Sequence, residues 1–254
     1  MKTALFILTL VLAGSQYADA NCINPKDYLD STVSLVRYNA FYDDYKDGGT
    51  AWFYKDARTL VTAGHVAMGI LLSSEWSSLE IRQRKDLYTI SETQPARILQ
   101  IGNIASASNT EIAFMEKYAK VDLAIIELAF DFHGARPLEI SQSKPPHYSP
   151  LWAIAYPKNK AVLANGRSIP PGYDKKYLEE YASMLHVNIQ NPRLRHGASG
   201  APILNCEGKV AGILNIYIDR VLHLANGKTI KRPASAPTNY AVPASFITEL
   251  LERK

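Results

Sequence analysis

Short segments with the hydrophobic pattern of β-strands follow one another through most of the chain. Some alternate polar with mostly apolar side chains, as a strand buried on one face does, and others are short continuous apolar runs. Glycine, asparagine and proline residues lie between them. This succession predicts an all-β sandwich or barrel and disfavours repeated strand–helix–strand units. The segments are residues 31–37, 49–54, 59–63, 123–126, 151–156 and 210–218.

Two stretches depart from the strand pattern. Residues 174–185 are largely polar with apolar side chains at helical spacing, which predicts a loop insertion with a short helix capped by Asp174. Residues 243–252 predict an amphipathic C-terminal helix with Pro243 at its first position. Because nothing follows this helix, we expect no appended binding domain of the PDZ kind.

The first twenty residues have the organisation of a secretory signal peptide. Lys2 gives a positive start, residues 4–13 form a mostly apolar run, and Ala18 and Ala20 are the small residues that a signal peptidase requires. The run is too short to span a bilayer, which argues against the alternative of an N-terminal membrane anchor. We therefore expect cleavage after Ala20, and a secreted or periplasmic mature domain over residues 21–254.

The chain has two cysteines, Cys22 and Cys206. A lipid anchor on Cys22 is disfavoured, because Asn21 stands where a lipidation signal needs glycine or alanine. An oxidising compartment allows a disulfide between the two, but the sequence does not establish that they meet, and two free thiols are an equal alternative. Neither cysteine has a partner at zinc-ligand spacing.

Composition limits the partners of the protein. The chain has 254 residues, 47% of them hydrophobic, which is enough for one large core or two small cores in close contact. The net charge is +4, but the sequence contains no run of lysine or arginine residues that could bind along a phosphate backbone. We therefore expect no nucleic-acid partner. The six histidines include no pair at ligand spacing, which disfavours a metal hydrolase, and we expect no cofactor.

Three short motifs contain the groups that peptide hydrolysis needs, namely a nucleophile, a base and a group that orients the base. His65 follows an apolar strand that ends in small residues, and Asp122 opens another apolar strand. Ser199 stands among small residues directly before a third strand, where the chain can turn tightly and bring N–H groups close to a substrate carbonyl. Each motif alone has an ordinary structural explanation, whereas their combination and order favour a catalytic site.

Together these motifs resemble those of the chymotrypsin-like serine peptidases. Thr-Ala-Gly-His at 62–65, Asp-Leu-Ala-Ile at 122–125 and Gly-Ala-Ser-Gly-Ala-Pro at 197–202 match the family's motifs in the family's order. Residues 152–157 and 240–243 look like two further family segments. The resemblance runs from about residue 31 to the C-terminus and is closest to the HtrA-type and glutamyl-endopeptidase-like branches. It implies two six-stranded antiparallel Greek-key β-barrels with the active site between them.

The resemblance implies a role for each matched residue. Ser199 attacks the scissile carbonyl, His65 takes its proton and later protonates the leaving amine, and Asp122 holds the tautomer of His65. The backbone N–H groups of Gly197 and Ser199 form the oxyanion hole. The implied function is that of a secreted serine endopeptidase acting on protein or peptide substrates through an acyl-enzyme.

Two departures from the family pattern affect the nucleophile loop. Ala198 stands where digestive members carry an aspartate that pairs with a new N-terminus after zymogen cleavage, so that switch is absent. Ala201 replaces the usual second glycine, which requires a negative φ at this position.

The resemblance also locates a pocket for the side chain that precedes the scissile bond. Arg193 lies near its base, and no acidic residue stands there, which disfavours a preference for lysine or arginine. Arg193 could pair with an acidic side chain or point to solvent. Since Tyr217 could narrow the pocket, we expect small or aliphatic residues. The residues that would line the wall are Leu214, Asn215, Ile216 and Tyr217.

Two other functions compete with this interpretation. One is a catalytically inactive protease homologue that acts as a binding module, against which the intact set of three catalytic residues argues. The other is an α/β-hydrolase esterase, whose Gly-x-Ser-x-Gly elbow would need glycine at Ala201 and a catalytic histidine after the serine. The strand-rich pattern disfavours that fold as well.

Overall fold

The structure is a computed structural model. It describes residues 22–39, 44–71, 78–84, 90–101, 122–171, 184–192, 194, 196–217, 221–223, 229–231 and 238–252. The expected signal peptide at 1–20, Arg193 and nearly all of the helix expected at 174–185 lie outside the described residues. For Ile216 and Tyr217 only the backbone is described.

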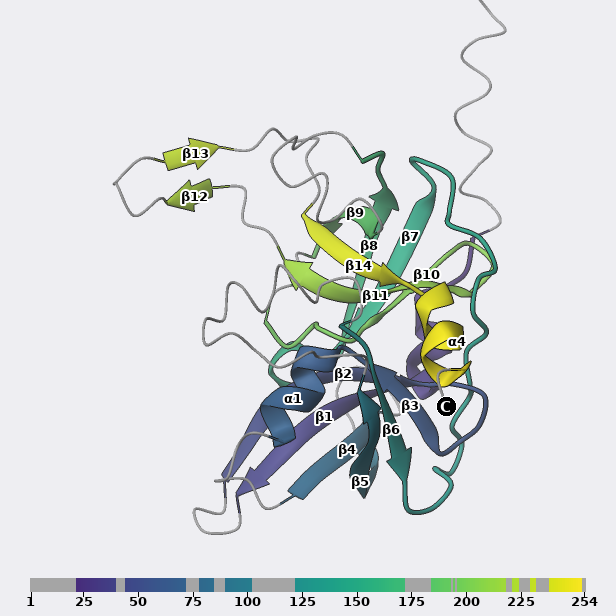
Figure 1. Cartoon of the computed structure of the whole chain (residues 1–254), viewed down its shortest axis with the longest axis vertical. Helices are drawn as coiled ribbons and strands as arrows, with labels where there is room; N and C mark the ends of the chain where they lie inside the picture. Colours follow the sequence, from purple (N-terminus) through teal and green to yellow (C-terminus); the bar gives the residue numbers. More distant parts are fainter. Residues whose placement is uncertain are drawn as a thin grey trace, which may run out of the picture.

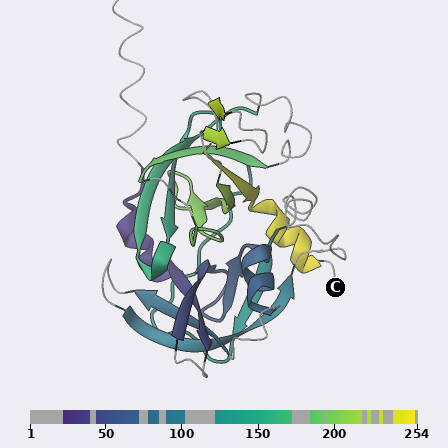
Figure 2. The same cartoon turned by 90° about the vertical axis from the view of Figure 1, so that its left-hand side faces the viewer.

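The strands form two barrels that pack against each other (Figure 1, Figure 2). Barrel one consists of β1 (Thr32–Asn39), β2 (Asp44–Phe53), β3 (Thr59–Thr62), β4 (Ser78–Arg84), β5 (Ile90–Ile101) and β6 (Ala124–Leu128). Barrel two consists of β7 (Pro150–Ala155), β8 (Val162–Ser168), β9 (Leu185–Asn191), β10 (Pro202–Leu204), β11 (Val210–Tyr217) and β14 (Asn239–Pro243). The helical elements that the text uses are η1 (Pro25–Ser31), α1 (Gly64–Leu71), η3 (Pro157–Asn159) and α4 (Ser245–Glu252).

Both barrels are closed by antiparallel pairing. The strand order is β1-β2-β3-β6-β5-β4 in the first and β10-β11-β14-β9-β8-β7 in the second. A separate pair, β12 (Val221–His223) and β13 (Thr229–Lys231), projects from barrel two (Figure 1). The expected fold of two six-stranded antiparallel barrels with a C-terminal helix is therefore confirmed.

Strand alternation gives each barrel its own apolar interior. In β2, Ala51 and Phe53 face the interior of barrel one, while Trp52 between them faces the opposite side. The interior of barrel two is lined largely by small side chains, which lets its strands and the nucleophile loop approach closely. These small residues are Ala153, Ala155, Ala164, Ala198, Ala201, Ala211 and Ala241.

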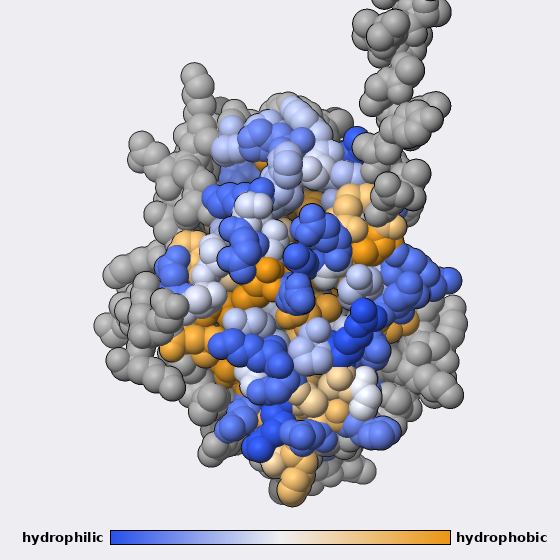
Figure 3. All heavy atoms as spheres, turned by 90° about the vertical axis from the view of Figure 1, so that its right-hand side faces the viewer, coloured by the Kyte–Doolittle hydropathy of each residue, from blue (hydrophilic) through white to orange (hydrophobic). Residues whose placement is uncertain are grey.

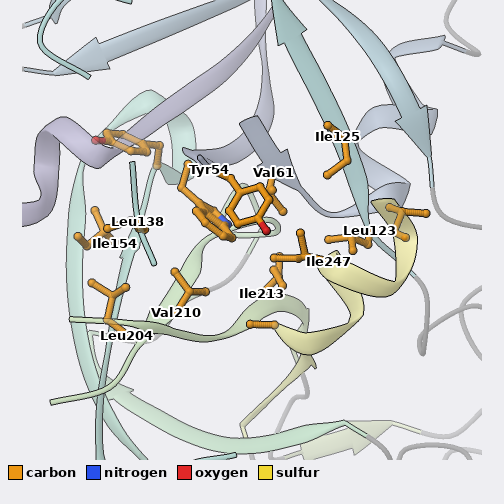
Figure 4. Close-up of a cluster of buried hydrophobic side chains, with 14 of the residues drawn as sticks. Tyr54, Val61, Leu123, Ile125, Leu138, Ile154, Leu204, Val210, Ile213 and Ile247 are labelled. Carbon is orange, nitrogen blue, oxygen red and sulfur yellow. The ribbon is translucent and has the colours of Figure 1, made fainter. Parts of the chain in front are cut away.

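A third apolar cluster joins the two barrels (Figure 4). Trp52 and Val61 come from barrel one, Ile154 and Ile213 come from barrel two, and Ile247 comes from α4. All five side chains have no exposed surface. Full burial of a side chain of this kind contributes about 1.5–3 kcal/mol, so the cluster fixes how one barrel sits on the other.

Two local predictions need correction, and one helix was not predicted. The C-terminal helix begins at Ser245 rather than Pro243, because β14 extends to Pro243, which pairs with Gly212 of β11. Leu185, expected at the end of a helix, begins β9. Helix α1 was not expected at all, because Ala63, directly before it, has no side chain that could cap the helix.

A disulfide joins Cys22 to Cys206, across 184 positions of sequence. Neither cysteine is free, so the disulfide alternative is the one that the structure contains. The bond fastens the segment before η1 to the turn that follows β10. In the same region a Cβ on Gly208 would collide with the Tyr28 side chain, so this glycine lets η1 lie against the turn.

Replacing both Cys22 and Cys206 by serine should lower the free energy of unfolding by about 2–5 kcal/mol, because the cross-link restricts a long loop in the unfolded chain. Urea unfolding of the oxidised protein and of the double variant measures the difference. Reduced wild-type protein serves as the control and should unfold like the variant. Coinciding curves for oxidised protein and variant would contradict the prediction.

Candidate active site

His65 lies in the first turn of α1, directly after β3. A Cβ on the preceding Gly64 would lie 2.7 Å from Asp122 Oδ1 and 2.9 Å from the backbone nitrogen of Leu123. Real Cβ atoms do not approach other atoms so closely, so Gly64 is what lets the segment before β6 reach the start of the helix. The small residues before His65 therefore have a physical purpose in the fold.

Asp122 contacts His65 through both carboxylate oxygens. Oδ2 lies 2.6 Å from the ring nitrogen Nδ1, and Oδ1 accepts a hydrogen bond from the His65 backbone N–H at 2.5 Å. This carboxylate lies at the N-terminus of α1, where unpaired N–H groups and the helix dipole favour a negative charge. Since the Asp122 side chain is only 9% exposed, solvent competes little for these contacts. One carboxylate thus fixes both the position and the rotation of the imidazole.

The surroundings of His65 strengthen it as a base. Burial lowers the pKa of His65, because it disfavours the charged ring. The hydrogen bond and the negative charge of Asp122, with a hydrogen bond to the side chain of Asn215, raise the pKa by more than burial lowers it. The net result is a pKa above the ordinary histidine value, which suits a group that accepts a proton near neutral pH.

Ser199 lies in a tight turn whose two glycines the backbone requires. Gly197 and Gly200 have φ values of +87° and +88°, in the region that favours glycine. A Cβ on Gly197 would lie 2.9 Å from Pro157 Cα, and one on Gly200 would collide with the carbonyl oxygen of Thr50. Ala201 is not among the residues with positive φ, so it meets the requirement for a negative φ that follows from alanine replacing the usual glycine.

The backbone of this turn orients the Ser199 N–H. The carbonyl oxygen of Ala198 accepts a hydrogen bond from Ala201 N at 3.1 Å. In a trans peptide the N–H points opposite to the C=O, so the Ser199 N–H faces away from that bond. Gly197 and Ser199 are both partly exposed, whereas Ala198 between them is 1% exposed. The two donors expected in the oxyanion hole therefore come from the accessible part of the turn.

Gly49 shows that the nucleophile turn and α1 are close neighbours. A Cβ on Gly49 would lie 2.9 Å from Val66 Cγ1 and 3.1 Å from the carbonyl oxygen of Ser199. Val66 is the residue after His65 in α1. The structure thus brings the three predicted catalytic residues, from three distant parts of the sequence, to the junction of the two barrels.

Asn215 lies beside both the predicted nucleophile and the predicted base. Ser199 Oγ donates a hydrogen bond to the Asn215 backbone carbonyl oxygen at 3.4 Å, and the Asn215 side chain contributes to raising the pKa of His65. The pairing of β11 with β14 shifts register at Asn215, between Leu214 and Ile216, and such bulges commonly redirect a side chain. The sequence analysis placed Asn215 only in the pocket wall. A lone amide within an apolar strand was the available signal.

Of the other residues expected to line the pocket, only Leu214 has a described side chain. Leu214 is 2% exposed and its side chain packs in the core of barrel two. Its backbone braces the nucleophile turn, because its carbonyl oxygen accepts from Gly200 N at 2.7 Å and its N–H donates to the Ala201 carbonyl at 2.8 Å. Arg193 and the side chains of Ile216 and Tyr217 are not among those that the structure describes.

The arrangement contains a hydroxyl nucleophile, an oriented imidazole and a buried carboxylate. These are the groups that acyl transfer through a covalent intermediate requires. Within the part of the chain that the structure describes, no three histidine, cysteine, aspartate or glutamate side chains are grouped so as to hold a metal ion.

The family model described as "Trypsin-like peptidase domain" matches residues 49–213, a span that includes His65, Asp122 and Ser199. A search of curated proteins found no match.

We expect Asp122→Asn to lower the pKa of His65 below the ordinary histidine value, because burial then opposes protonation without the compensating charge. Asn215→Leu should lower it by less, because Asp122 remains. NMR titration of the His65 ring protons measures both shifts. An unchanged or higher His65 pKa in Asp122→Asn would contradict this account.

Proposed function

Because the chain belongs to the family of trypsin-like peptidases, we propose that it is an exported serine endopeptidase with His65, Asp122 and Ser199 as its catalytic triad. The observation that carries the proposal is the two-point contact of Asp122 with the ring and backbone of His65, at 2.6 and 2.5 Å. This contact holds the imidazole in the orientation that a general base beside a serine nucleophile requires. The partly exposed Ser199, in a glycine turn beside the same helix, supplies the nucleophile.

The reaction proceeds in two halves. Ser199 Oγ attacks the scissile carbonyl carbon while its proton passes to His65 Nε2, and Asp122 stabilises the imidazolium that forms. The N–H groups of Gly197 and Ser199 donate to the oxyanion. When the C–N bond breaks, His65 gives its proton to the leaving amine, which leaves an ester on Ser199. Water then attacks this ester, with His65 again taking a proton, and releases the acid product.

The nucleophile turn needs no charge pair to hold its shape. Ala198, where digestive members carry an aspartate, is 1% exposed and packs in the core of barrel two. The hydrogen bonds of the turn to Leu214 and within itself are made by backbone groups. We infer a site that forms on folding, without release of a new N-terminus.

Export is part of the proposal. Residues 1–20 form the signal peptide, cleaved after Ala20, and the Cys22–Cys206 disulfide suits an oxidising compartment. No helix among the described residues has the length and apolar character to cross a bilayer. On the face that Figure 3 shows, hydrophilic side chains are interspersed with the hydrophobic ones.

The proposed substrates are proteins or peptides with a small or aliphatic residue before the scissile bond. Tyr217 would narrow the pocket, whereas the buried side chain of Leu214 packs in the core of barrel two and does not line the pocket. The base position carries Arg193 rather than an acidic residue, so nothing there would pair with lysine or arginine.

Ser199→Ala should abolish peptide hydrolysis, with a loss of kcat on the order of a millionfold, because the alanine has no nucleophile to form the ester. A fluorogenic peptide assay measures the loss, and labelling by an organophosphonate probe should disappear in the same variant. Ser143→Ala is the control, because Ser143 is exposed and lies in the segment that connects β6 to β7. This variant should keep both peptide hydrolysis and labelling by the probe. Hydrolysis that survives in Ser199→Ala would contradict the nucleophile assignment. A folded wild-type protein that neither cleaves nor labels would favour an inactive homologue that binds peptides.

Cleavage of a peptide library should favour alanine, valine and leucine directly before the cut, because the expected pocket offers no anionic partner. Mass spectrometry of the products identifies the cleavage sites, and Ser199→Ala supplies the background. A profile dominated by lysine or arginine would contradict the pocket assignment. A profile dominated by glutamate that disappears in Arg193→Gln would instead assign charge recognition to Arg193.

A further inference from the structure

Thr50 of β2 makes a concentrated set of hydrogen bonds at the junction of the two barrels. It is completely buried, and every polar group it carries has a partner. Its hydroxyl donates to the Gly197 carbonyl oxygen at 3.1 Å and accepts from Tyr156 N at 2.9 Å. Its backbone N–H donates to the Ser199 carbonyl oxygen at 2.9 Å. Its own carbonyl oxygen accepts from the Thr62 hydroxyl at 2.7 Å.

These bonds connect barrel one to the nucleophile turn of barrel two. Thr50 and Thr62 belong to β2 and β3, whereas Tyr156 follows β7 and Gly197 precedes the nucleophile. The Thr50 hydroxyl is the atom common to both barrel-two segments, because it donates to one and accepts from the other. A methyl group in its place would remove this partner from the Gly197 carbonyl and from the buried N–H of Tyr156, and an unsatisfied buried N–H is costly in a protein interior.

The Thr50 hydroxyl binds the peptide group that lies between the two proposed oxyanion donors. Gly197 N–H belongs to the peptide group before that carbonyl, and Ser199 N–H belongs to the peptide group after it. The bond from Ala201 N to the Ala198 carbonyl fixes the following peptide group, and the Thr50 N–H fixes the one after Ser199. Three consecutive peptide groups are therefore held, two of them by Thr50.

The nucleophile turn packs closely against Thr50 and its neighbours. Gly200, with φ +88°, lies so close to the Thr50 carbonyl oxygen and the Thr62 hydroxyl that any Cβ would collide with both. Gly197 likewise lies against Pro157 of η3. The nucleophile turn therefore packs directly against β2, β3 and η3, which lie around Thr50.

We propose that Thr50 is a positioning residue of this peptidase, whose hydroxyl orients the Gly197–Ala198 peptide group and so sets the oxyanion hole formed by Gly197 and Ser199. The inference rests on the proposed function, since it assigns Thr50 to the catalytic step of the same site. Thr50 does not touch the substrate. It acts through the backbone that does, by holding donors in place before the oxyanion forms.

Thr50→Val and Thr50→Ser test the proposal, because valine keeps the shape of threonine without the hydroxyl and serine keeps the hydroxyl without the methyl group. Complete loss of one oxyanion donor lowers kcat by about 100- to 1000-fold, so a misplaced donor in Thr50→Val should lower kcat by about tenfold or more. KM should change by less than about threefold, because only transition-state contacts are lost. The affinity for a peptide aldehyde, which forms a tetrahedral adduct with the serine, should fall by about the same factor as kcat. Thr50→Ser should restore both quantities.

Ser34→Ala is the matched control. Ser34 pairs with Thr50 across β1 and β2, is equally buried, and its hydroxyl has no hydrogen-bond partner among the described residues. It should keep wild-type kcat, which separates loss of a buried hydroxyl as such from loss of this one. Thr50→Ala is the second variant without the hydroxyl, for use where valine prevents folding.

The outcomes separate this inference from the proposed function. Wild-type kcat and aldehyde affinity in a folded Thr50→Val or Thr50→Ala, with an active wild type, would overturn the inference and leave the peptidase proposal standing. Equal losses in Thr50→Val and Ser34→Ala, or no rescue by Thr50→Ser, would also overturn it. A wild-type protein without Ser199-dependent hydrolysis would overturn the proposed function and this inference with it.

Discussion

The apolar contact between the two barrels is what the candidate site depends on. His65 and Asp122 belong to barrel one and Ser199 belongs to barrel two, so no single barrel contains the site. The cluster around Trp52, Val61, Ile154 and Ile213 removes water from the interface and fixes one barrel on the other. This contact is non-directional, and by itself it would tolerate small shifts. The directional part comes from hydrogen bonds at its edge, where Thr50 binds Gly197, Ser199 and Tyr156.

Small residues make this close approach achievable. Gly49, Gly64 and Gly200 each stand where a Cβ would collide with a residue of another strand or turn of the site. The glycines that a motif comparison treats as signatures are thus positions where two backbones meet. The same argument explains why Ala201 can replace a glycine that is usual in the family, since its φ is not positive.

The sequence predicted the parts of the molecule whose causes are local. Hydrophobic patterning located β1, β2, β3, β6, β7 and β11, and the three short motifs located His65, Asp122 and Ser199. What it missed depends on residues far away in the sequence. Helix α1 is capped by Asp122, which lies 57 positions further on, so no nearby signal marks its start. Thr50 resembles any strand threonine until its partners at 156, 197 and 199 are known.

The sequence left the pairing of the two cysteines undecided for the same reason, because they are 184 positions apart. Pro243 was assigned to a helix because its pairing with Gly212 of β11 is a contact that no local pattern reveals.

The proposed function requires Ser199 to form a covalent acyl-enzyme with the help of His65 and Asp122. Mass spectrometry of the protein quenched in acid during turnover of a peptide ester substrate would detect this intermediate. We expect an acyl adduct on the peptide that contains Ser199, which accumulates in wild-type protein and is absent from Ser199→Ala. An adduct on another residue, or rapid hydrolysis with no adduct on Ser199 at any quench time, would contradict it.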